Sequence, residues 1–346
     1  MQNQRRMPAE WEPHRATWIS WPHEESDWHD KFETIPWVYA EISRVLARSE
    51  FVEILCNSDD IRVKAEFCLD MHHVPRDKYR THILPTDRSW LRDSAPTAVK
   101  VENTTEWIKW KFNAWAKYDN YSADSRVPQF ISEISGINIH EAMIDDDSRP
   151  LVLEGGAIET DGNGTLIVTE ECLQSEVQCR NPDLTKADYE KAFSKYLGIS
   201  STIWLIGGCE GDDTHGHIDD VARFYAPGKV LLAFPEDSDD PFHDVSIENE
   251  KILMAAKTSS GKSIEVKRLP MPRQMYFGEE RLPASYANFY IANKSVMVPT
   301  FNDVNDLLAL HIISKAFPER EVIGISAVDL VLGFGTLHCL TQQEPV

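Results

Sequence analysis

A chain of 346 residues with 42% hydrophobic and 26% charged residues has the composition of a folded globular protein, long enough for one large closed architecture or for two or three ordinary domains. Its formal net charge of −21 disfavours nucleic acid as a partner, because neutralising phosphates requires a basic surface. No stretch approaches the roughly 18 uncharged apolar residues of a membrane span, so we expect no membrane partner either.

Five segments carry apolar residues at helical spacing. In chain order they are 31–50, 124–136, 184–198, 245–259 and 303–317, with an additional helical stretch near 61–72. The segment 184–198 opens with a capping pattern, Thr185 followed by Asp188, and ends at Gly198. From the second segment onward the starts are about 60 residues apart, a period typical of units packed around an axis.

Short apolar runs surround these helices. A hairpin-like pair precedes each helix from the second onward, and three of the pairs turn at Gly162–Gly164, Pro227–Gly228 and Asn293–Lys294. The runs TAVKV and WIKWKFNAW hold the same position before the helix at 124–136. Because another short strand follows each helix, the repeating unit is strand–strand–helix–strand, used about five times.

The two ends of the chain supply the remaining hairpin. We expect RATWISWP (15–22) to pair with LHCLTQQ (337–343), so that the N- and C-terminal strands close a ring and leave no exposed sheet edge. In this interpretation residues 1–346 form a single domain of units packed around an axis.

Polar residues recur in the links between the last strand of one unit and the hairpin of the next. The candidates are Trp90 and Asp93 in DRSWLRDSAP, Glu154 in RPLVLEGGAI, Asp213, His217 and Asp219 in GGCEGDDTHGHIDDVAR, and Cys339 in GFGTLHC. The fourth link offers no single candidate, and its residues 270–284 are expected to form a loop. Equivalent links in repeats around an axis lie at the same end, so we expect the candidates to converge at the mouth of a central channel.

These motifs resemble the guanidino-group-modifying (pentein) superfamily, and most closely its agmatine deiminase and bacterial peptidylarginine deiminase-like branch. The matching stretches run from MPAEWEPHRATWISWPH through DRSWLRD, KFNAW, LEGGAIETDGNGT, GDDTHGHIDDVARF and SYANFYIAN to HCLTQQEP. The resemblance implies a five-fold pseudosymmetric α/β propeller of ββαβ units and a catalytic Cys339. It also implies that Asp93 and Asp219 bind the guanidinium group.

The residues suit that chemistry. Two carboxylates, Asp93 and Asp219, can hold a planar guanidinium by charge-assisted hydrogen bonds while the Cys339 thiolate attacks its carbon. His217, oriented by Glu154, would protonate the departing ammonia and then activate water against a thiouronium intermediate. The expected products are a ureido compound and ammonia, and no step requires a metal or another cofactor.

Agmatine is the expected substrate, giving N-carbamoylputrescine for putrescine synthesis. Trp90 would contact its alkyl chain and Asp213 its distal amine, duties that the resemblance assigns to these positions. Free arginine or peptidyl-arginine, giving citrulline, is the alternative, because this chain reads GFGTLHC where the agmatine-specific pattern reads GGGNIHC. Phe334 and Thr336 are the two residues that depart from the agmatine pattern.

Two other classes stay open. One is a metal-dependent hydrolase built on Asp212, His215, His217 and Asp219; the other is a propeller that binds cationic ligands without catalysis. The six cysteines contain no CxxC pair, so neither a disulfide framework nor a zinc ribbon is indicated. With no apolar secretory stretch in MQNQRRMPAEW, a cytoplasmic location is expected, and homo-oligomerisation stays open.

Overall fold

One sheet topology recurs through the chain. The structure, a computed structural model, describes residues 5–144 and 148–346. Five sheets each contain an antiparallel strand pair followed by a parallel strand. They are β21–β2–β3–β4 (Thr341–Pro345, His14–Ser20, Phe51–Cys56, Tyr79–Ile83), β1–β5–β6–β7 (Arg5–Arg6, Thr97–Val101, Thr104–Lys109, Ile139–Glu141), β10–β11–β12 (Glu159–Thr160, Thr165–Thr169, Ser201–Leu205), β13–β14–β15 (Ala222–Ala226, Lys229–Phe234, Glu265–Pro270) and β18–β19–β20 (Tyr290–Ile291, Ser295–Thr300, Glu321–Ser326).

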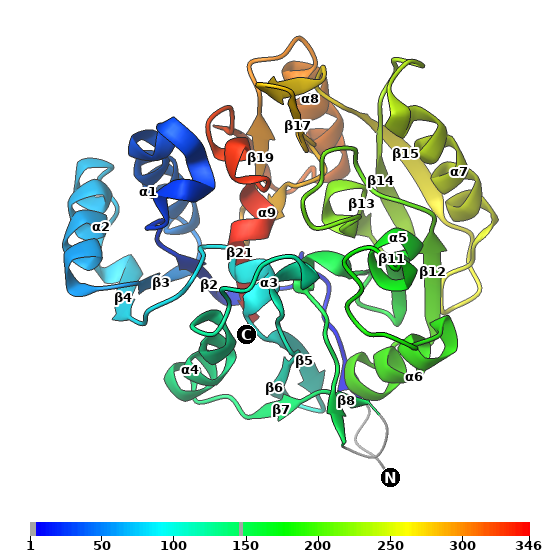
Figure 1. The fold of residues 1–346 in the computed structure, drawn as a ribbon, viewed down its shortest axis with the longest axis horizontal. Coiled ribbons are helices and arrows are strands. Elements are labelled where there is room, and N and C mark those ends of the chain that lie inside the picture. The colour runs from blue at the N-terminus through cyan, green and yellow to red at the C-terminus, as the bar shows by residue number, and fades with distance from the viewer. Residues whose placement is uncertain (1–4, 145–147) are drawn as a thin grey trace.

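One long helix joins the parallel strands of each sheet. These helices are α1 (Ile35–Leu46), α4 (Val127–Ser135), α6 (Lys186–Leu197), α7 (Pro241–Ala255) and α8 (Asp306–Ala316), and α2 (Asp59–Met71) is the additional helix. All six predicted helices are therefore confirmed, with ends shifted by a few residues. Figure 1 shows the long helices at the periphery, whereas the short helices α3 (Leu91–Ser94) and α9 (Leu337–Leu340) lie near the centre.

Helix α6 illustrates why the sequence forms these elements. The Thr185 side chain accepts from the amide of Asp188, and the Asp188 side chain accepts from the amide of Thr185, which completes the predicted capping box. The helix ends at Gly198 in the left-handed region (φ 71°), where a Cβ atom would lie 1.8 Å from the carbonyl oxygen of Arg5. Its apolar stripe, which includes Tyr189 and Phe193, is buried in a core cluster shared with strands β5, β6 and β11.

The two ends of the chain share one sheet, as predicted. β21 runs antiparallel to β2 with Gln342 opposite Trp18, and every residue of β21 is buried. The prediction was wrong for residues 337–340, which form the helical turn α9 instead of a strand. The turn forms because the amides of His338 and Cys339 point at the Asn288 side chain rather than at a strand partner (3.0 and 3.4 Å).

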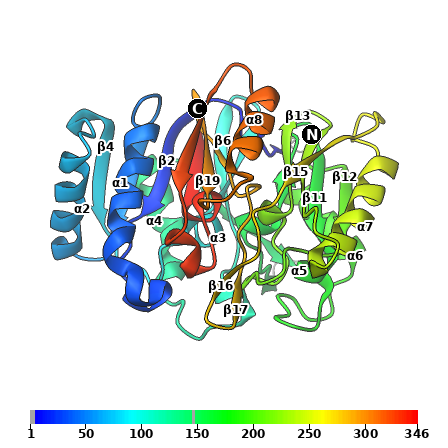
Figure 2. The ribbon, with the colours of Figure 1, turned by 90° about the horizontal axis from the view of Figure 1, so that it is seen from above.

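The fourth link is also more ordered than predicted. Residues 270–284 include a hairpin, β16 (Met275–Phe277) and β17 (Glu280–Leu282), whose turn contains Gly278 at φ 62°. Glycine permits this conformation without steric cost, and three backbone-paired residues on each side hold the ends together. Figure 2 shows this hairpin at the edge of the molecule opposite to the C-terminus. In the part of the chain that the structure describes, no helix is long and apolar enough to span a bilayer.

Candidate active site

The candidate residues from the links lie together. Trp90, Asp93, Asp213 and Cys339 line one cavity of about 300 Å³. The other three candidates are buried beside it. His217 Nδ1 lies 3.8 Å from Asp93 Oδ1, and Asp219 Oδ2 lies 3.5 Å from Cys339 Sγ, whereas Glu154 Oε2 lies 3.5 Å from His217 Nε2. The predicted convergence of four links is therefore present in the structure.

Asp93 sits in the short helix α3 and is held from two sides. Its Oδ1 accepts from the amide of Gly156 (3.0 Å) and its Oδ2 from the indole of Trp115 (2.9 Å). Burial raises the pKa of Asp93 to about 6; His217 acts in the opposite direction, and Asp219 adds to the increase. A Cβ on Gly156 would lie 2.5 Å from His217 Nδ1, so the close approach of these groups requires glycine there.

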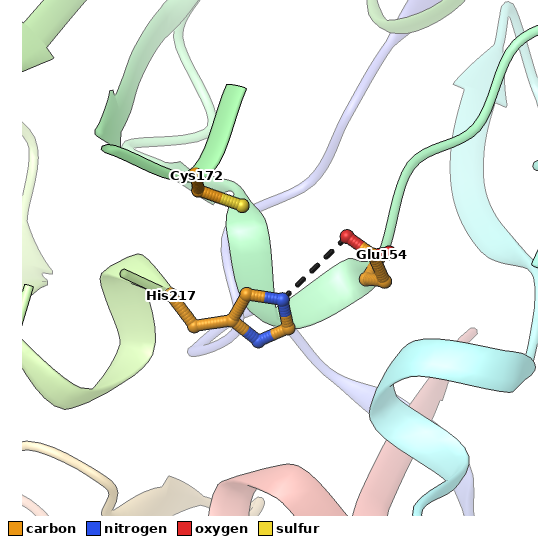
Figure 3. A group of neighbouring side chains, drawn as sticks. All are labelled: Glu154, Cys172 and His217. Carbon is orange, nitrogen blue, oxygen red and sulfur yellow. Dashed lines mark ion pairs between the residues drawn. The ribbon is translucent and has the colours of Figure 1, made fainter. Parts of the chain in front are cut away.

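His217 and Glu154 form a buried ion pair. Figure 3 shows the Glu154 carboxylate facing the imidazole of His217, with Cys172 beside both. Burial lowers the pKa of His217, but Asp93, Cys172 and Glu154 outweigh it and hold that pKa well above its ordinary value. Glu154 is itself anchored by Arg180 (3.1 Å), and this cation keeps the pKa of Glu154 below its ordinary value despite burial. An imidazolium held by carboxylates is suited to act as a general acid.

Cys339 lies in an acidic, dry environment. Its side chain is 5% exposed, and burial, Asp219, Asp220 and Asp93 together raise the pKa of the thiol well above its ordinary value. The Asn288 amide donates to Sγ over 3.1 Å. In the absence of a cation the thiol form is therefore favoured.

Asp219 is oriented by a residue that the sequence interpretation did not select. His338 Nδ1 lies 2.7 Å from Asp219 Oδ2, and His338 Nε2 lies 2.8 Å from Glu10 Oε2. Burial opposes ionisation of Asp219, but the hydrogen bond and charge of His338 hold its pKa below the ordinary value. The other oxygen, Asp219 Oδ1, is buried without a hydrogen-bond partner among the described residues, so it is available to a ligand.

Glu10 belongs to a wider buried network. Arg223 Nη2 donates to Glu10 Oε1 (3.0 Å), Arg223 Nε to Glu159 Oε2 (3.1 Å), and Arg92 Nη2 to Glu10 Oε2 (3.4 Å). Burial opposes ionisation of Glu10, but these cations and His338 hold its pKa far below the ordinary value. Glu10 and His338 both lie in stretches that carry the family resemblance, and that is the only sequence signal that could have identified them.

The mouth of the cavity carries the residues expected to contact the rest of a substrate. The Trp90 ring packs against Trp28 with centroids 5.6 Å apart, and a Cβ atom on Gly333 or Gly335 would lie 2.7 or 2.9 Å from atoms of that ring. Asp213 also lines the cavity, but its carboxylate already accepts from Tyr118 (2.9 Å) and is paired with the ammonium of Lys117. The ammonium of Lys117, which the sequence interpretation did not consider, therefore lies at this cavity.

The four residues of the metal hypothesis do not converge. The carboxylate of Asp212 accepts from the backbone amides of Thr214, Gly216 and His217, and it acts as a structural cap. His215 Nε2 faces Ser175 instead (3.0 Å). Within the described residues, the groups with metal-ligand geometry are Glu154–Cys172–His217 and Asp219–Asp220–Cys339, and both include candidate residues of the same cavity region.

The two departures in the nucleophile loop have structural consequences. Phe334 lines the cavity and adopts a left-handed conformation at φ 61°, a conformation that glycine would adopt without strain. The Thr336 hydroxyl donates to Asn288 Oδ1 (2.8 Å). The turn that carries Cys339 is thus tied to the segment before β18.

Comparisons with known proteins agree with this arrangement. The chain matches the family described as Porphyromonas-type peptidyl-arginine deiminase over residues 6–345. A putative agmatine deiminase of Marinomonas sp. (strain MWYL1) is 35% identical over 369 residues, covering 98% of this chain and 94% of the relative. Agmatine deiminase of Enterococcus faecalis superposes with a TM-score of 0.91 at 30% identity, over 99% of this chain and 96% of that chain.

A second solved structure points the same way. The putative arginine deiminase of Porphyromonas gingivalis has a TM-score of 0.86 at 32% identity, over 99% of this chain and 98% of that chain. Similarity over this length covers all five sheets as well as the links that line the cavity. The mixed α/β chain described above belongs to the Porphyromonas-type peptidyl-arginine deiminase family.

Proposed function

We propose that this protein is a cysteine-dependent hydrolase that deiminates a guanidino compound, with agmatine as the preferred substrate. One observation carries the proposal: a thiol, two carboxylates and a His–Glu ion pair meet at one cavity in a chain of this family. Relatives along the full length are named agmatine deiminases, which supports hydrolysis of a C–N bond in a linear amidine.

Asp93 and Asp219 bind the guanidinium in this proposal. The unpartnered Oδ1 of Asp219 is the acceptor for one N–H group, and Asp93, which lines the cavity, accepts from another. Burying a cation between two carboxylates also relieves the cost of holding those carboxylates in a dry site. The guanidinium carbon is thereby fixed within reach of Cys339 Sγ.

Ionisation of Cys339 follows substrate binding. Asp219 and Asp93, two of the carboxylates that raise the pKa of the thiol, are the ones that the substrate cation neutralises, so the thiol releases its proton to solvent and the thiolate forms in the complex. Sγ then bonds to the guanidinium carbon. The C–N bond breaks as His217 protonates the departing ammonia, and a covalent thiouronium remains on Cys339.

In the second half of the reaction His217 acts as a general base instead of a general acid. Having lost its proton, it takes one from water, and the resulting hydroxide attacks the thiouronium carbon and releases Sγ with the ureido product. Glu154 stays ionised beside Arg180 and stabilises the imidazolium whenever His217 is protonated.

The side chains at the mouth of the cavity determine which chemical group the substrate can carry at the end far from its guanidinium. Trp90 offers an aromatic face to an alkyl chain, and Asp213 offers a carboxylate to a terminal ammonium once Lys117 is displaced. Lys117 also supports a second candidate, free or peptidyl-arginine, because its ammonium can meet a substrate carboxylate or carbonyl. The family description favours this candidate too.

The recurring sheet topology supports the finer proposals about architecture. We infer that the five strand–strand–helix–strand units form a five-fold α/β propeller and a single domain over residues 1–346. A cytoplasmic location and association into a homo-oligomer remain proposals. All six cysteines are free thiols, which suits a reducing compartment.

Ammonia release is the deciding assay. We would compare agmatine, L-arginine, a capped arginine peptide and guanidinobutyrate with the wild-type enzyme, Cys339→Ser and Cys339→Ala. The proposal predicts N-carbamoylputrescine from agmatine, loss of turnover in both variants and turnover that a chelator leaves unchanged. Undiminished turnover in the variants would exclude the covalent mechanism. Ligand-induced thermal stabilisation without ammonia would instead support a non-catalytic binding protein.

A further inference from the structure

A buried group of three side chains includes Cys172, which the proposed reaction does not use. Ligand atoms of Glu154, Cys172 and His217 all lie within 4.8 Å of one another, and all three residues are buried. Figure 3 shows the Cys172 sulfur and the Glu154 carboxylate on the same side of the imidazole. A thiolate, an imidazole and a carboxylate are the ligands that zinc takes in proteins, so the chemistry of the group fits that metal.

Two of these residues present polar atoms without hydrogen bonds. Among the described residues, Glu154 Oε2 and both ring nitrogens of His217 are buried without a hydrogen-bond partner, and Oε2 and Nε2 face each other only as an ion pair at 3.5 Å. Arg180 donates to the other carboxylate oxygen, Glu154 Oε1, over 3.1 Å. Oε2 is therefore available to a ligand. Buried polar atoms normally have partners, so their absence at one point indicates a place for a cation.

The backbone around the group is held by Thr169. Its hydroxyl donates to the carbonyl of Gly216 (2.5 Å) and accepts from the amide of Cys172 (3.1 Å). Thr169 thereby caps the short helix α5 (Glu170–Gln174) and ties it to the residue before His217. Cys172 and His217 come from different segments, yet one side chain fixes the distance between their backbones.

The distances suit one zinc ion. Two nitrogen or oxygen ligands about 2.1 Å from a tetrahedral ion lie about 3.4 Å apart, and the 3.5 Å between Glu154 Oε2 and His217 Nε2 already matches this. A sulfur ligand about 2.3 Å from the ion lies about 3.6 Å from its neighbours. Because Cys172 Sγ is within 4.8 Å of its two partner atoms, it needs to move by about 1.2 Å at most. Three protein ligands leave the fourth position of the ion to water.

The charge of the group is also suited to a divalent ion. With Cys172 as a thiol, the negative charge of Glu154 and the positive charge of a protonated His217 cancel. Zinc binding releases one proton from the thiol and one from the imidazolium, and the complex of Zn²⁺ with a thiolate, a neutral imidazole and a carboxylate is again neutral. The exchange therefore adds no net charge to a buried site. The sulfur ligand disfavours Mg²⁺ and Ca²⁺, which prefer oxygen.

We propose that Glu154, Cys172 and His217 form an inhibitory zinc site, in which the ion is bound by the Cys172 thiolate, His217 Nε2 and Glu154 Oε2. Zinc then takes the place of the proton on Nε2. A neutral, metal-bound imidazole is a far weaker acid than an imidazolium, so His217 no longer protonates the departing ammonia. Zinc binding follows from the group itself, whereas inhibition rests on the proposed function, because it takes His217 as the general acid.

Binding is tested with Co²⁺, which occupies zinc sites and gives a near-ultraviolet charge-transfer band when a thiolate is a ligand. The background is Cys339→Ala, because this variant lacks the nucleophile thiol and requires no turnover. We expect the band in Cys339→Ala, its displacement by Zn²⁺ and its loss in Cys339→Ala/Cys172→Ala. The matched control is Cys339→Ala/Cys56→Ala, which should keep the band, since Cys56 is a buried free thiol outside the group.

The consequence is tested by zinc inhibition of ammonia release from agmatine. Loss of the thiolate should raise the Zn²⁺ concentration for half inhibition by roughly 100-fold or more in Cys172→Ala, whereas Cys56→Ala should stay within about 3-fold of wild type. A chelator should restore the turnover of zinc-treated wild type. Cys172→Ser keeps the volume of the side chain and serves if Cys172→Ala does not fold, which circular dichroism melts determine.

Three results would overturn the proposal: no band in Cys339→Ala, a band that survives in Cys339→Ala/Cys172→Ala, or zinc inhibition in Cys172→Ala equal to that of wild type. The third result would place the inhibiting ion on another group, such as Asp219, Asp220 and Cys339. Failure of the proposed function is a separate outcome. It is detected as turnover that survives in Cys339→Ser, whereas the Co²⁺ band reports on metal binding alone.

Discussion

The fall of kcat/KM at low pH should reflect protonation of Asp93, and the hydrogen bond from Trp115 should determine the pH at which this fall occurs. In the proposed mechanism a guanidinium binds between Asp93 and Asp219 only when both are ionised, and the pKa of Asp93 is raised by burial to about 6. The log of kcat/KM, which reports the free enzyme, should therefore fall as the pH drops below about 6. The raised pKa of His217 keeps the imidazolium protonated through this range.

The indole of Trp115 donates to Asp93 Oδ2 over 2.9 Å and lowers the pKa of that carboxyl. Trp115→Phe removes the donor and keeps an aromatic ring against Phe112. A hydrogen bond to an ionised group contributes about 1.5–3 kcal/mol, and one pKa unit corresponds to about 1.4 kcal/mol. The variant should thus move the acid limb upward by roughly 1–2 pH units, from about 6 to about 7–8.

The raised pKa of Asp93 affects the pH dependence of stability with the same sign in the wild type and in Trp115→Phe. Because the folded-state pKa of Asp93 lies above its ordinary value of 3.8, the native state binds the proton more tightly, and stability from this group is lost as the pH rises from about 4 to about 6. A bound guanidinium cation offsets that loss. Stabilisation by agmatine in the Cys339→Ala background should therefore be larger at pH 7 than at pH 5.

The assay is kcat/KM by ammonia release from pH 4.5 to 9, with Asp27→Asn as the control. Asp27 lines the same cavity, and burial raises its pKa to about 6 as well, so an acid limb that disappears in Asp27→Asn would refute the assignment to Asp93. A limb that stays in place in Trp115→Phe would refute the reasoning about the hydrogen bond. A wild-type limb near pH 4 would show that burial of Asp93 does not perturb it.

Three further changes test other parts of the structure. Lys117→Ala frees the carboxylate of Asp213, so kcat/KM for agmatine should rise several-fold relative to arginine, measured by paired ammonia assays; an unchanged ratio would contradict the pairing seen here. Arg223→Met leaves the buried Glu159 without its arginine and removes one of the two arginines that contact Glu10, so it should lower the free energy of unfolding by about 3–5 kcal/mol in urea titrations, whereas a change below about 1 kcal/mol would mean that the network is solvated. Deleting residues 341–346 removes a fully buried strand from β2, so the cooperative thermal transition should be lost, and a retained transition would argue against the terminal pairing.

Much of the fold could be predicted from the sequence because two periods are clear in it. Apolar residues recur at helical spacing within a unit, and the units themselves recur about every 60 residues. The apolar spacing of 184–198 and the capping pair Thr185–Asp188 depend on local chemistry alone, and both are present in α6. The pairing of the termini was also predictable, because four complete hairpins left one strand at each end without a partner. Repetition supplied the long-range information that a single element lacks.

The site was predictable to the level of which residues meet, and no further. Equivalent links had to lie at one end of the units, so Asp93, His217 and Cys339 could be placed together without knowing any distance. The turn at 337–340 was missed because its conformation depends on Asn288, a partner about fifty residues away that no local pattern marks. The pairing of Lys117 with Asp213 was missed for the same reason, since it joins the segment between β6 and α4 to the third link.

The electrostatics of the cavity explain why an acidic site can hold a nucleophilic thiol. Carboxylates that bind a guanidinium must also raise the pKa of a thiol beside them. Asp219, 3.5 Å from Sγ, raises the pKa of Cys339 and is the carboxylate proposed to bind the guanidinium. Each effect alone would be a disadvantage, because burying carboxylates costs the free enzyme stability and their charge keeps Cys339 as the unreactive thiol. A planar cation in the cavity reverses both at once, since it neutralises the carboxylates and brings positive charge to the sulfur. In the proposed mechanism, reactivity at Cys339 is therefore conditional on a cationic substrate, which selects guanidines over neutral amides.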